Sequence, residues 1–290
     1  MLIIREARSN DFDRIYPLLL EFKNLNLRKD DWRQLFRDHS GLQNNQFGWV
    51  LLDGEEVVGF VGTILSQRNV RNQTVRMCNM SSWVVKQQYR AHSLALQAKV
   101  MADKSVTITN LSPTQQVLKL MEKLGFTLMD KSERIILPVV TTRTFTDQCE
   151  ILTEAGAVGR ALTGEHLRFF RDHRLPFNHH ILLRAPEGDC YVMMNRSLKA
   201  IWRNVRVPFG RVHHISAPHI FVRHLDRLVV RVATSLKVVA MIVDDRMLNR
   251  AAPWHSFMRP GGERKAAFRS EVLSAEEIDG LYTEAVLLNY

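Results

Sequence analysis

The stretch SSWVVKQQYRAHSLALQ, residues 81–97, decides the fold of this chain. Its β-branched and aromatic residues predict a strand that ends at Val85, followed by a turn and a helix that begins near Ser93. The side chains around the start of this helix are small, at Ala91, Ser93 and Ala95. Backbone amides at a helix N-terminus carry the positive end of the helix dipole, and small side chains let a phosphate approach them. The stretch therefore predicts an anion-binding turn, to which Arg90 adds a full positive charge.

The hydrophobic pattern around this stretch predicts a mixed α/β sheet within about 140 residues. Two strand-like runs flank Asp53-Gly54, a dipeptide that favours a hairpin because both positions tolerate positive φ. After a short buried strand at 105–111, Ser112 or Thr114 is expected to cap a helix that ends at Gly125. The other predicted elements are a strand at 2–7, helices at 11–22 and 30–39, and closing strands at 126–130 and 133–139.

Two motifs in this half resemble those of the GNAT acyltransferase superfamily. Val84-Val85, followed by Tyr89-Arg90-Ala91-His92-Ser93-Leu94-Ala95, is similar to the family's coenzyme A signature. That signature has Arg or Gln, two residues, Gly, one residue, and then Gly or Ala. The segment from Met121 to Phe126, MEKLGF, is similar to the second marker, a helix that ends in a Tyr-Glu-Lys-Leu-Gly-Phe type of sequence. The resemblance covers residues 1 to about 138 and includes the order of the elements.

This resemblance implies an acyl-CoA-dependent N-acyltransferase that moves acetyl from acetyl-CoA to an amine by direct attack in a ternary complex. The strand ending at Val85 would part from the strand near Thr107, and the pantetheine arm would lie in the gap between them. The pyrophosphate would sit on the backbone amides of Ala91 to Ala95. The residues expected to bind the coenzyme are Trp83, Val84, Val85, Arg90, Ala91, His92, Ser93, Leu94, Ala95 and Thr114.

The sequence departs from the family pattern at two positions that matter for catalysis. Met121 stands where the family often has a tyrosine that acts as general acid, and methionine has no proton to donate. Ser81 stands near a position that often holds a carboxylate on the central strand. The candidates for holding water or the departing thiolate are Asn79, Ser81 and Ser112.

The second half repeats the element order of the first, which predicts a tandem duplication. A hairpin is expected around Glu187-Gly188, followed by a central strand at 209–221, a helix at 223–236 and a buried strand at 237–245. A closing strand is predicted at 283–290. The resulting domain prediction is a coenzyme-binding unit at 1–140, a linker at 141–164 and a second GNAT-like unit at 165–290.

The second unit has no equivalent of the phosphate-binding turn. At the corresponding place it carries SAPHIFVRHLD, residues 216–226, with a proline and bulky side chains instead of small ones. We therefore expect a degenerate copy that packs against the first unit and helps to shape the acceptor cleft.

The composition narrows the partners of the chain. A formal net charge of +10 over 290 residues favours anionic ligands, so the amine acceptor, a small molecule or a peptide, is expected to be acidic. The basic residues form no run that could follow a nucleic acid, and no apolar run is long enough to span a membrane. Cys78, Cys149 and Cys190 lie too far apart for a metal motif, and the histidines show no metal-ligand spacing. We expect a cytoplasmic protein without a metal, a membrane partner or a nucleic-acid partner.

Two other functions stay open at the level of sequence. The chain could be a binding or regulatory protein that keeps the GNAT fold without its chemistry, as Met121 and Ser81 would allow. It could also be a Fem-type transferase that takes an aminoacyl group from tRNA. The net positive charge suits binding to tRNA, but the basic residues are scattered along the sequence and form no cluster that could follow an RNA.

Overall fold

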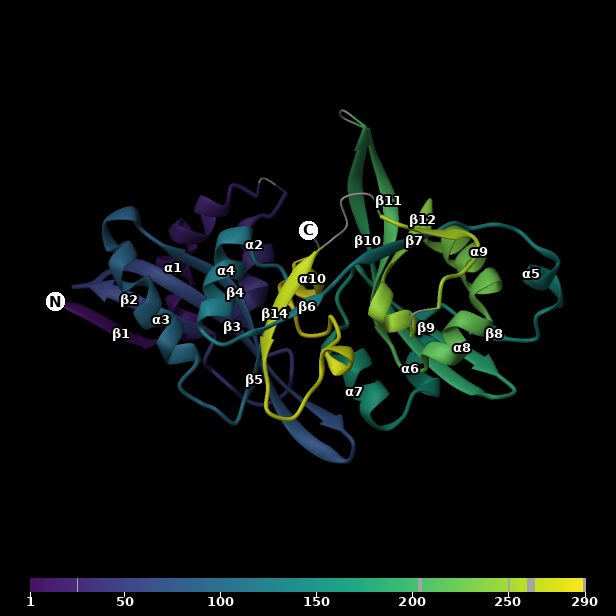
Figure 1. Ribbon diagram of the computed structural model, residues 1–290, viewed down its shortest axis with the longest axis horizontal. Coiled ribbons are helices and arrows are strands. Elements are labelled where there is room, and N and C mark those ends of the chain that lie inside the picture. The colour runs from purple at the N-terminus through teal and green to yellow at the C-terminus, as the bar shows by residue number, and fades with distance from the viewer. Residues whose placement is uncertain (25, 203–204, 250, 260–263, 289–290) are drawn as a thin grey trace.

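The computed structural model describes residues 1–24, 26–202, 205–249, 251–259 and 264–288. It forms two lobes, each built on a seven-stranded mixed sheet (Figure 1). The N-terminal half of the chain supplies most of the first sheet and the C-terminal half most of the second. The fold is mixed α/β, as the sequence predicts.

The first sheet has the strand order β1-β2-β3-β4-β5-β14-β6. The hairpin predicted at Asp53-Gly54 is confirmed, since β2 and β3 pair antiparallel across it and Gly54 has a φ of +56°. β4 pairs antiparallel with β3 and parallel with β5. The strands are β1 (Leu2–Glu6), β2 (Gly48–Asp53), β3 (Glu56–Val70), β4 (Gln73–Val85), β5 (Thr107–Asn110), β6 (Thr127–Asp130) and β14 (Lys265–Arg269).

The second sheet has the same order, β8-β9-β10-β11-β12-β7-β13, when it is read from its opposite edge. The hairpin predicted at Glu187-Gly188 joins β9 to β10. The strands are β7 (Glu133–Ile136), β8 (Glu150–Leu152), β9 (Asn178–Ala185), β10 (Gly188–Trp202), β11 (Val205–Ile215), β12 (Ala240–Asp244) and β13 (Ser256–Met258). The shared order supports the predicted tandem arrangement of two similar sheets.

One strand of each sheet comes from the other half of the chain. β7, predicted to close the first sheet, instead lies between β12 and β13 of the second. β14, from near the C-terminus, takes the matching place between β5 and β6. The connection between β6 and β7 is only Lys131-Ser132, and neither residue has the positive φ that a two-residue hairpin turn needs. The chain therefore continues into the second lobe instead of turning back.

Helices cover the faces of both sheets. The helix expected near Ser93 is α3, and the cap of α4 is Thr114, whose hydroxyl accepts the Val117 amide at 3.3 Å. The helices of the first lobe are α1 (Phe12–Leu19), α2 (Lys29–Trp32), α3 (Ser93–Val100) and α4 (Gln115–Lys123). Those that follow are α5 (Thr142–Thr146), α6 (Ala155–Ala161), α7 (Gly164–Asp172), α8 (Pro218–Arg223), α9 (Leu225–Leu236) and α10 (Glu284–Leu287). Within the described ranges, no helix is long and apolar enough to cross a membrane.

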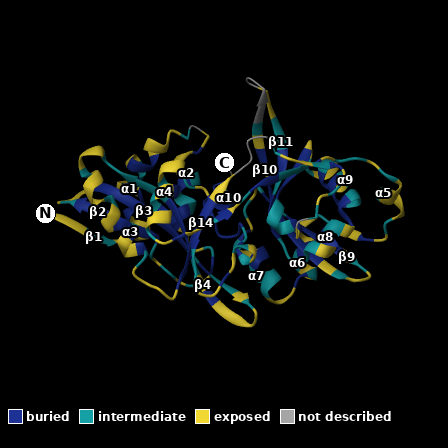
Figure 2. Cartoon of the chain, in the orientation of Figure 1, coloured by how far each residue is buried: buried dark blue, intermediate teal, exposed yellow. Residues whose placement is uncertain are grey.

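Two further expectations differ from the structure. Residues 141–164, the predicted linker, contain α5, β8 and α6, and β8 is the edge strand of the second sheet. The strand predicted at 283–290 is wrong over its described part, because α10 occupies Glu284–Leu287. Three of the four residues of α10 are buried, and the segment lies between the two lobes (Figures 1 and 2). From this one turn the Glu284 side chain reaches the first lobe, while the carbonyls of Ala285 and Val286 accept hydrogen bonds from the second.

Candidate functional site

The two central strands of the first sheet separate partway along their length. β4 pairs with β5 at three positions only, Met77 with Thr107, Cys78 with Ile108 and Asn79 with Thr109. β5 ends one residue later at Asn110, whereas β4 continues to Val85. The sequence-based expectation that these strands part is therefore confirmed, with the closed end of the gap at Asn79.

A β-bulge in β4 changes the direction of the residues that line this gap. Gly62 of β3 faces Ser81, but Phe60 faces Val84, so two residues of β4 occupy the space opposite one residue of β3. Ser82, one of the two, has a φ of +48°, an uncommon value for serine. Such local strain persists where the surrounding structure holds it, and it is enriched at functional sites. The bulge was not predicted, because nothing in the sequence of β4 marks it.

A cavity of about 930 Å³, counting its part open to solvent, fills the gap. Its wall on β4 is formed by residues 80–83, and its opposite wall includes Asn110, Ser112 and Thr114. Phe22 and Trp32, whose rings stack 6.0 Å apart, also line it. The Ser81 hydroxyl and the Trp83 indole N–H are buried and have no hydrogen-bond partner among the described residues. Buried polar groups without partners are costly, so these two point to a ligand or water in the cavity.

A carboxylate from the C-terminal segment lies at the closed end of the gap. Glu284 is 5% exposed and accepts hydrogen bonds from the Asn79 amide at 2.7 Å and from the Ser112 hydroxyl. The Thr109 hydroxyl donates to the Asn79 side-chain oxygen at 3.1 Å, which fixes the amide so that its NH₂ faces Glu284. Two of the three predicted catalytic candidates therefore converge on one carboxylate.

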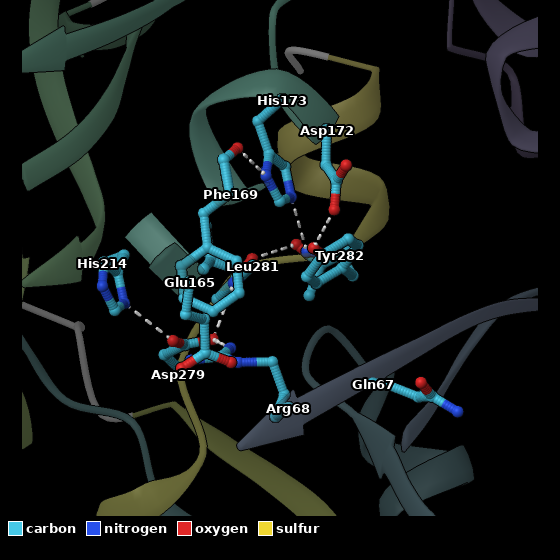
Figure 3. Close-up of polar contacts among 12 residues, drawn as sticks. Gln67, Arg68, Glu165, Phe169, Asp172, His173, His214, Asp279, Leu281 and Tyr282 are labelled. Carbon is cyan, nitrogen blue, oxygen red and sulfur yellow. Dashed lines mark hydrogen bonds and ion pairs between the residues drawn. The ribbon is translucent and has the colours of Figure 1, made fainter. Parts of the chain in front are cut away.

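The segment that carries Glu284 is anchored between the lobes (Figure 3). Asp279 binds Arg68 of β3 at 2.8 Å and the His214 Nδ1 of β11 at 2.8 Å. Three residues later, the Tyr282 amide donates to the His173 Nε2 at 3.3 Å. The Tyr282 hydroxyl donates to Asp172 at the end of α7. One strand of each sheet and one helix thus fix the approach to α10.

Electrostatics favours this anchor. Burial alone would raise the pKa of Asp279, but Arg68 and His214 outweigh it and hold the pKa well below its usual range. Burial lowers the pKa of His173 to about 3, so this ring is neutral and its Nε2 can accept the Tyr282 amide. The anchor therefore needs an ionised aspartate and a neutral histidine, both of which are present at neutral pH.

The strand-to-helix turn has the predicted outline. β4 ends at Val85, a 3₁₀ helix follows over Gln87–His92, and α3 begins at Ser93. Arg90 and His92 are exposed, and the described residues offer Arg90 no ion-pair partner. The Ser93 amide donates to the Arg90 carbonyl, and Ala91 and His92 lie inside the 3₁₀ helix, whose i→i+3 hydrogen bonds use their amides. Three of the five amides of the expected cradle are therefore already engaged. Leu94 and Ala95 follow in the first turn of α3, where amides lack an α-helical partner within the helix.

The other predicted residues lie along the same edge. Val84 and Val85 pair with Phe60 and Gly59 of β3, and Thr114 both caps α4 and lines the cavity. Met121, in contrast, is fully buried in the core beneath the sheet and does not reach the cavity. Glu284 was missed, since a single glutamate in the apolar run TEAVLLNY gives no sequence signal and its partners are some 170 to 205 positions away.

Comparison with known proteins gives a likeness in structure. No protein-family profile and no curated protein matches the sequence. A GCN5-related N-acetyltransferase from Anabaena variabilis has a TM-score of 0.59 at 10% identity, over 92% of this chain and 72% of that one. A GCN5-related N-acetyltransferase from Kribbella flavida has a TM-score of 0.56 at 13% identity, over 92% of this chain and 70% of that one. Eis1 from Mycobacterium abscessus has a TM-score of 0.52 at 14% identity, over 93% of this chain and 73% of that one. At these identities the likeness shows the fold alone, which is that of tandem GNAT-like acyltransferases.

Proposed function

We propose that this protein is an acyl-CoA-dependent N-acyltransferase that transfers acetyl from acetyl-CoA to an amine. The observation that carries the proposal is the buried carboxylate of Glu284 at the closed end of the β4–β5 gap, hydrogen-bonded to Asn79 and Ser112. A cavity with unpartnered polar groups adjoins it. The names of the structural neighbours, two of them GCN5-related N-acetyltransferases, support the same reaction class.

The residues present fit a coenzyme along this edge. The bulge makes β4 project at Ser82 and Trp83, which form part of the cavity wall. The unpartnered Trp83 N–H and Ser81 hydroxyl are donors for carbonyl groups of an acyl-pantetheine chain. The pyrophosphate would be held by Arg90 and by the first turn of α3. Ser93 and Ala95 are small enough to leave that approach open.

In the proposed reaction, Glu284 is the general base. As the amine nitrogen bonds to the thioester carbonyl carbon, Glu284 accepts the proton that the nitrogen must lose. The carbon–sulfur bond then breaks, and the Ser112 hydroxyl, which touches Glu284, passes that proton to the departing thiolate. Asn79 holds the carboxylate in position, and the Ser81 hydroxyl stabilises the oxygen that becomes negative.

We propose further that the second lobe binds no coenzyme. The turn after β11 leads at Pro218 into α8, and Ile220 and Phe221 of this helix are almost fully buried. These side chains fill the place that small residues leave open in the first lobe. The three free cysteines, all buried, support the proposal that the protein works in the cytoplasm.

A titration with acetyl-CoA tests the coenzyme part of the proposal. A ligand that binds only the folded state raises the melting temperature, so we expect a saturable rise. Ser93→Phe should abolish it, and Ala98→Phe, an exposed position on the same helix, is the matched control. No rise in the unsubstituted protein would contradict coenzyme binding.

Thiol release in the presence of an amine panel tests the transfer itself. We expect release that depends on both acetyl-CoA and amine. A protein that binds acetyl-CoA yet releases no thiol with any amine would support the binding or regulatory alternative.

A further inference from the structure

The second sheet opens in the same way as the first. β11 pairs with β12 at Phe209, Gly210 and Arg211 and then continues to Ile215 paired with β10 but not with β12. A second cavity of about 930 Å³, again counting its open part, lies at this gap. It is lined by Val212 and His213 of β11 and by Ile242 and Asp244 of β12. No residue of the predicted coenzyme site lines it, and the proposed function so far gives it no role.

The wall of this cavity is crowded with cations. Lys131, Lys199, Arg211 and Arg264 all line it. One buried carboxylate, that of Glu133, serves three arginines: Arg211 and Arg259 by direct hydrogen bonds and Arg264 at 3.7 Å. The other β-strand carboxylate in the lining, Asp244, is held by a two-pronged contact with Arg246. The two strand carboxylates of the wall are thus paired with arginines, and the third carboxylate of the lining, Glu284, accepts hydrogen bonds from Asn79 and Ser112.

Two lysines remain without a carboxylate partner within the described ranges. Lys199 has neither an ion pair nor a hydrogen bond, and burial together with Arg211 lowers its pKa to about 8. Lys131 donates only to the Leu111 carbonyl at 3.4 Å, and burial lowers its pKa as well. Both lysines are half-buried, and Glu133 acts on each of them only from beyond ion-pair distance, so an anion bound beside them would be favourable.

Unpartnered polar atoms in the same wall point to a missing ligand. The Nε2 of His213, a residue only 5% exposed, and the Nη2 of Arg211 are buried without a hydrogen-bond partner in the described structure. Both residues line the cavity. The lysines and the Arg211 Nη2 are donors, and the neutral His213 ring adds a donor in its Nε2–H tautomer. Donors gathered around one space are what a carboxylate or phosphate requires.

The two cavities meet at the proposed catalytic carboxylate. Ser112 and Glu284 line both of them, and they are the only residues that the two linings share among those described. A molecule seated in the basic cavity would therefore reach Glu284 from the side opposite to the acyl chain.

We propose that the basic cavity between the lobes binds the anionic group, a carboxylate or a phosphate, of the acceptor and presents its amine to Glu284. The inference rests on the proposed function and adds to it the acceptor class. It gives the second lobe a definite role, because Lys199, Arg211 and His213 hold the acceptor's charge while the first lobe holds the acyl donor. Amines without an anionic group would lack this attachment.

Anion binding is tested on the full chain by thermal shift and calorimetry, with inorganic pyrophosphate and citrate as the phosphate and carboxylate probes. We expect at least one probe to bind saturably, and the stronger of the two identifies the group. Lys199→Gln should weaken that binding about tenfold and Lys199→Arg should largely restore it. Arg196→Gln, which removes an exposed cation from the same strand, is the matched control. Since pyrophosphate could also bind beside Arg90, the titration is repeated in Ser93→Phe, where binding in the basic cavity should persist.

Turnover then separates this inference from the proposed function. With acetyl-CoA, glucosamine 6-phosphate is compared with glucosamine, and 4-aminobutyrate with 4-aminobutanol. We expect the anionic member of a pair to be preferred, and Lys199→Gln to raise its KM with little change in kcat. Saturable anion binding without any acetyl-CoA binding would overturn the proposed function and leave the anion site standing. Acetyl-CoA turnover without saturable anion binding, or with no effect of Lys199→Gln, would overturn the inference alone.

Discussion

Replacing Glu284 with glutamine tests the proposed chemistry at its centre. The carboxylate accepts one hydrogen bond from Asn79 and one from Ser112, whereas glutamine offers a single acceptor oxygen. Since Thr109 fixes the Asn79 amide as a donor, the glutamine oxygen can accept from Asn79 while its NH₂ donates to the Ser112 oxygen, so both contacts can remain and the free energy of unfolding should fall by only about 1 kcal/mol. Glutamine also cannot accept a proton. Loss of a general base lowers kcat/KM by roughly 10² to 10⁴, which corresponds to about 3–5 kcal/mol in the activation barrier.

The assay is thiol release from acetyl-CoA with a saturating amine, combined with acetyl-CoA binding by calorimetry. We expect Glu284→Gln to bind acetyl-CoA within about threefold of the unsubstituted protein while kcat/KM falls at least a hundredfold. Glu271 is an exposed glutamate 13 positions before Glu284, and Glu271→Gln should leave both quantities unchanged. A folded Glu284→Gln protein that keeps kcat/KM within threefold would refute the role of this carboxylate.

Three other outcomes follow from the structure. Asp279→Asn leaves the charge of Arg68 buried without a full partner and should lower the free energy of unfolding by about 3–5 kcal/mol in chemical denaturation. Burial lowers the pKa of His173 to about 3 and of His180 to about 4, so the unfolded state binds more protons below about pH 6.5. The free energy of unfolding is therefore highest above that pH, and on acidification it should fall by roughly 1.4 kcal/mol per pH unit for each ring. An unfolding free energy that stays constant between pH 6.5 and 5 would contradict the burial of both rings in the neutral form. Gly62→Ala would place a methyl group 2.6 Å from the unpartnered Ser81 hydroxyl of the cavity wall. The substitution should weaken acetyl-CoA binding more than it lowers the free energy of unfolding. An unchanged affinity in a titration would show that this wall does not touch the ligand.

Local sequence signals predicted much of the first lobe. The hairpin at Asp53-Gly54, the end of β4 at Val85 and the Thr114 cap each depend on residues only a few positions apart, and each is present in the structure. Turn and cap preferences act at that range, so a pattern can report them.

The features that sequence reasoning missed depend on distant segments. The exchange of β7 and β14 between the sheets follows from the geometry of a two-residue connection and from strands more than a hundred positions away. The Ser82 bulge depends on its pairing with β3. Asn79 and Ser112 were chosen as candidates from the first lobe alone, and only the folded chain brings Glu284 between them.

The most direct test of the account is a crystal structure of the protein with acetyl-CoA. We expect the pantetheine chain between β4 and β5, against Ser82 and Trp83, with the thioester beside Glu284 and the pyrophosphate at Arg90. Coenzyme found instead in the basic gap between β11 and β12, or on the surface away from Glu284, would contradict the central claim.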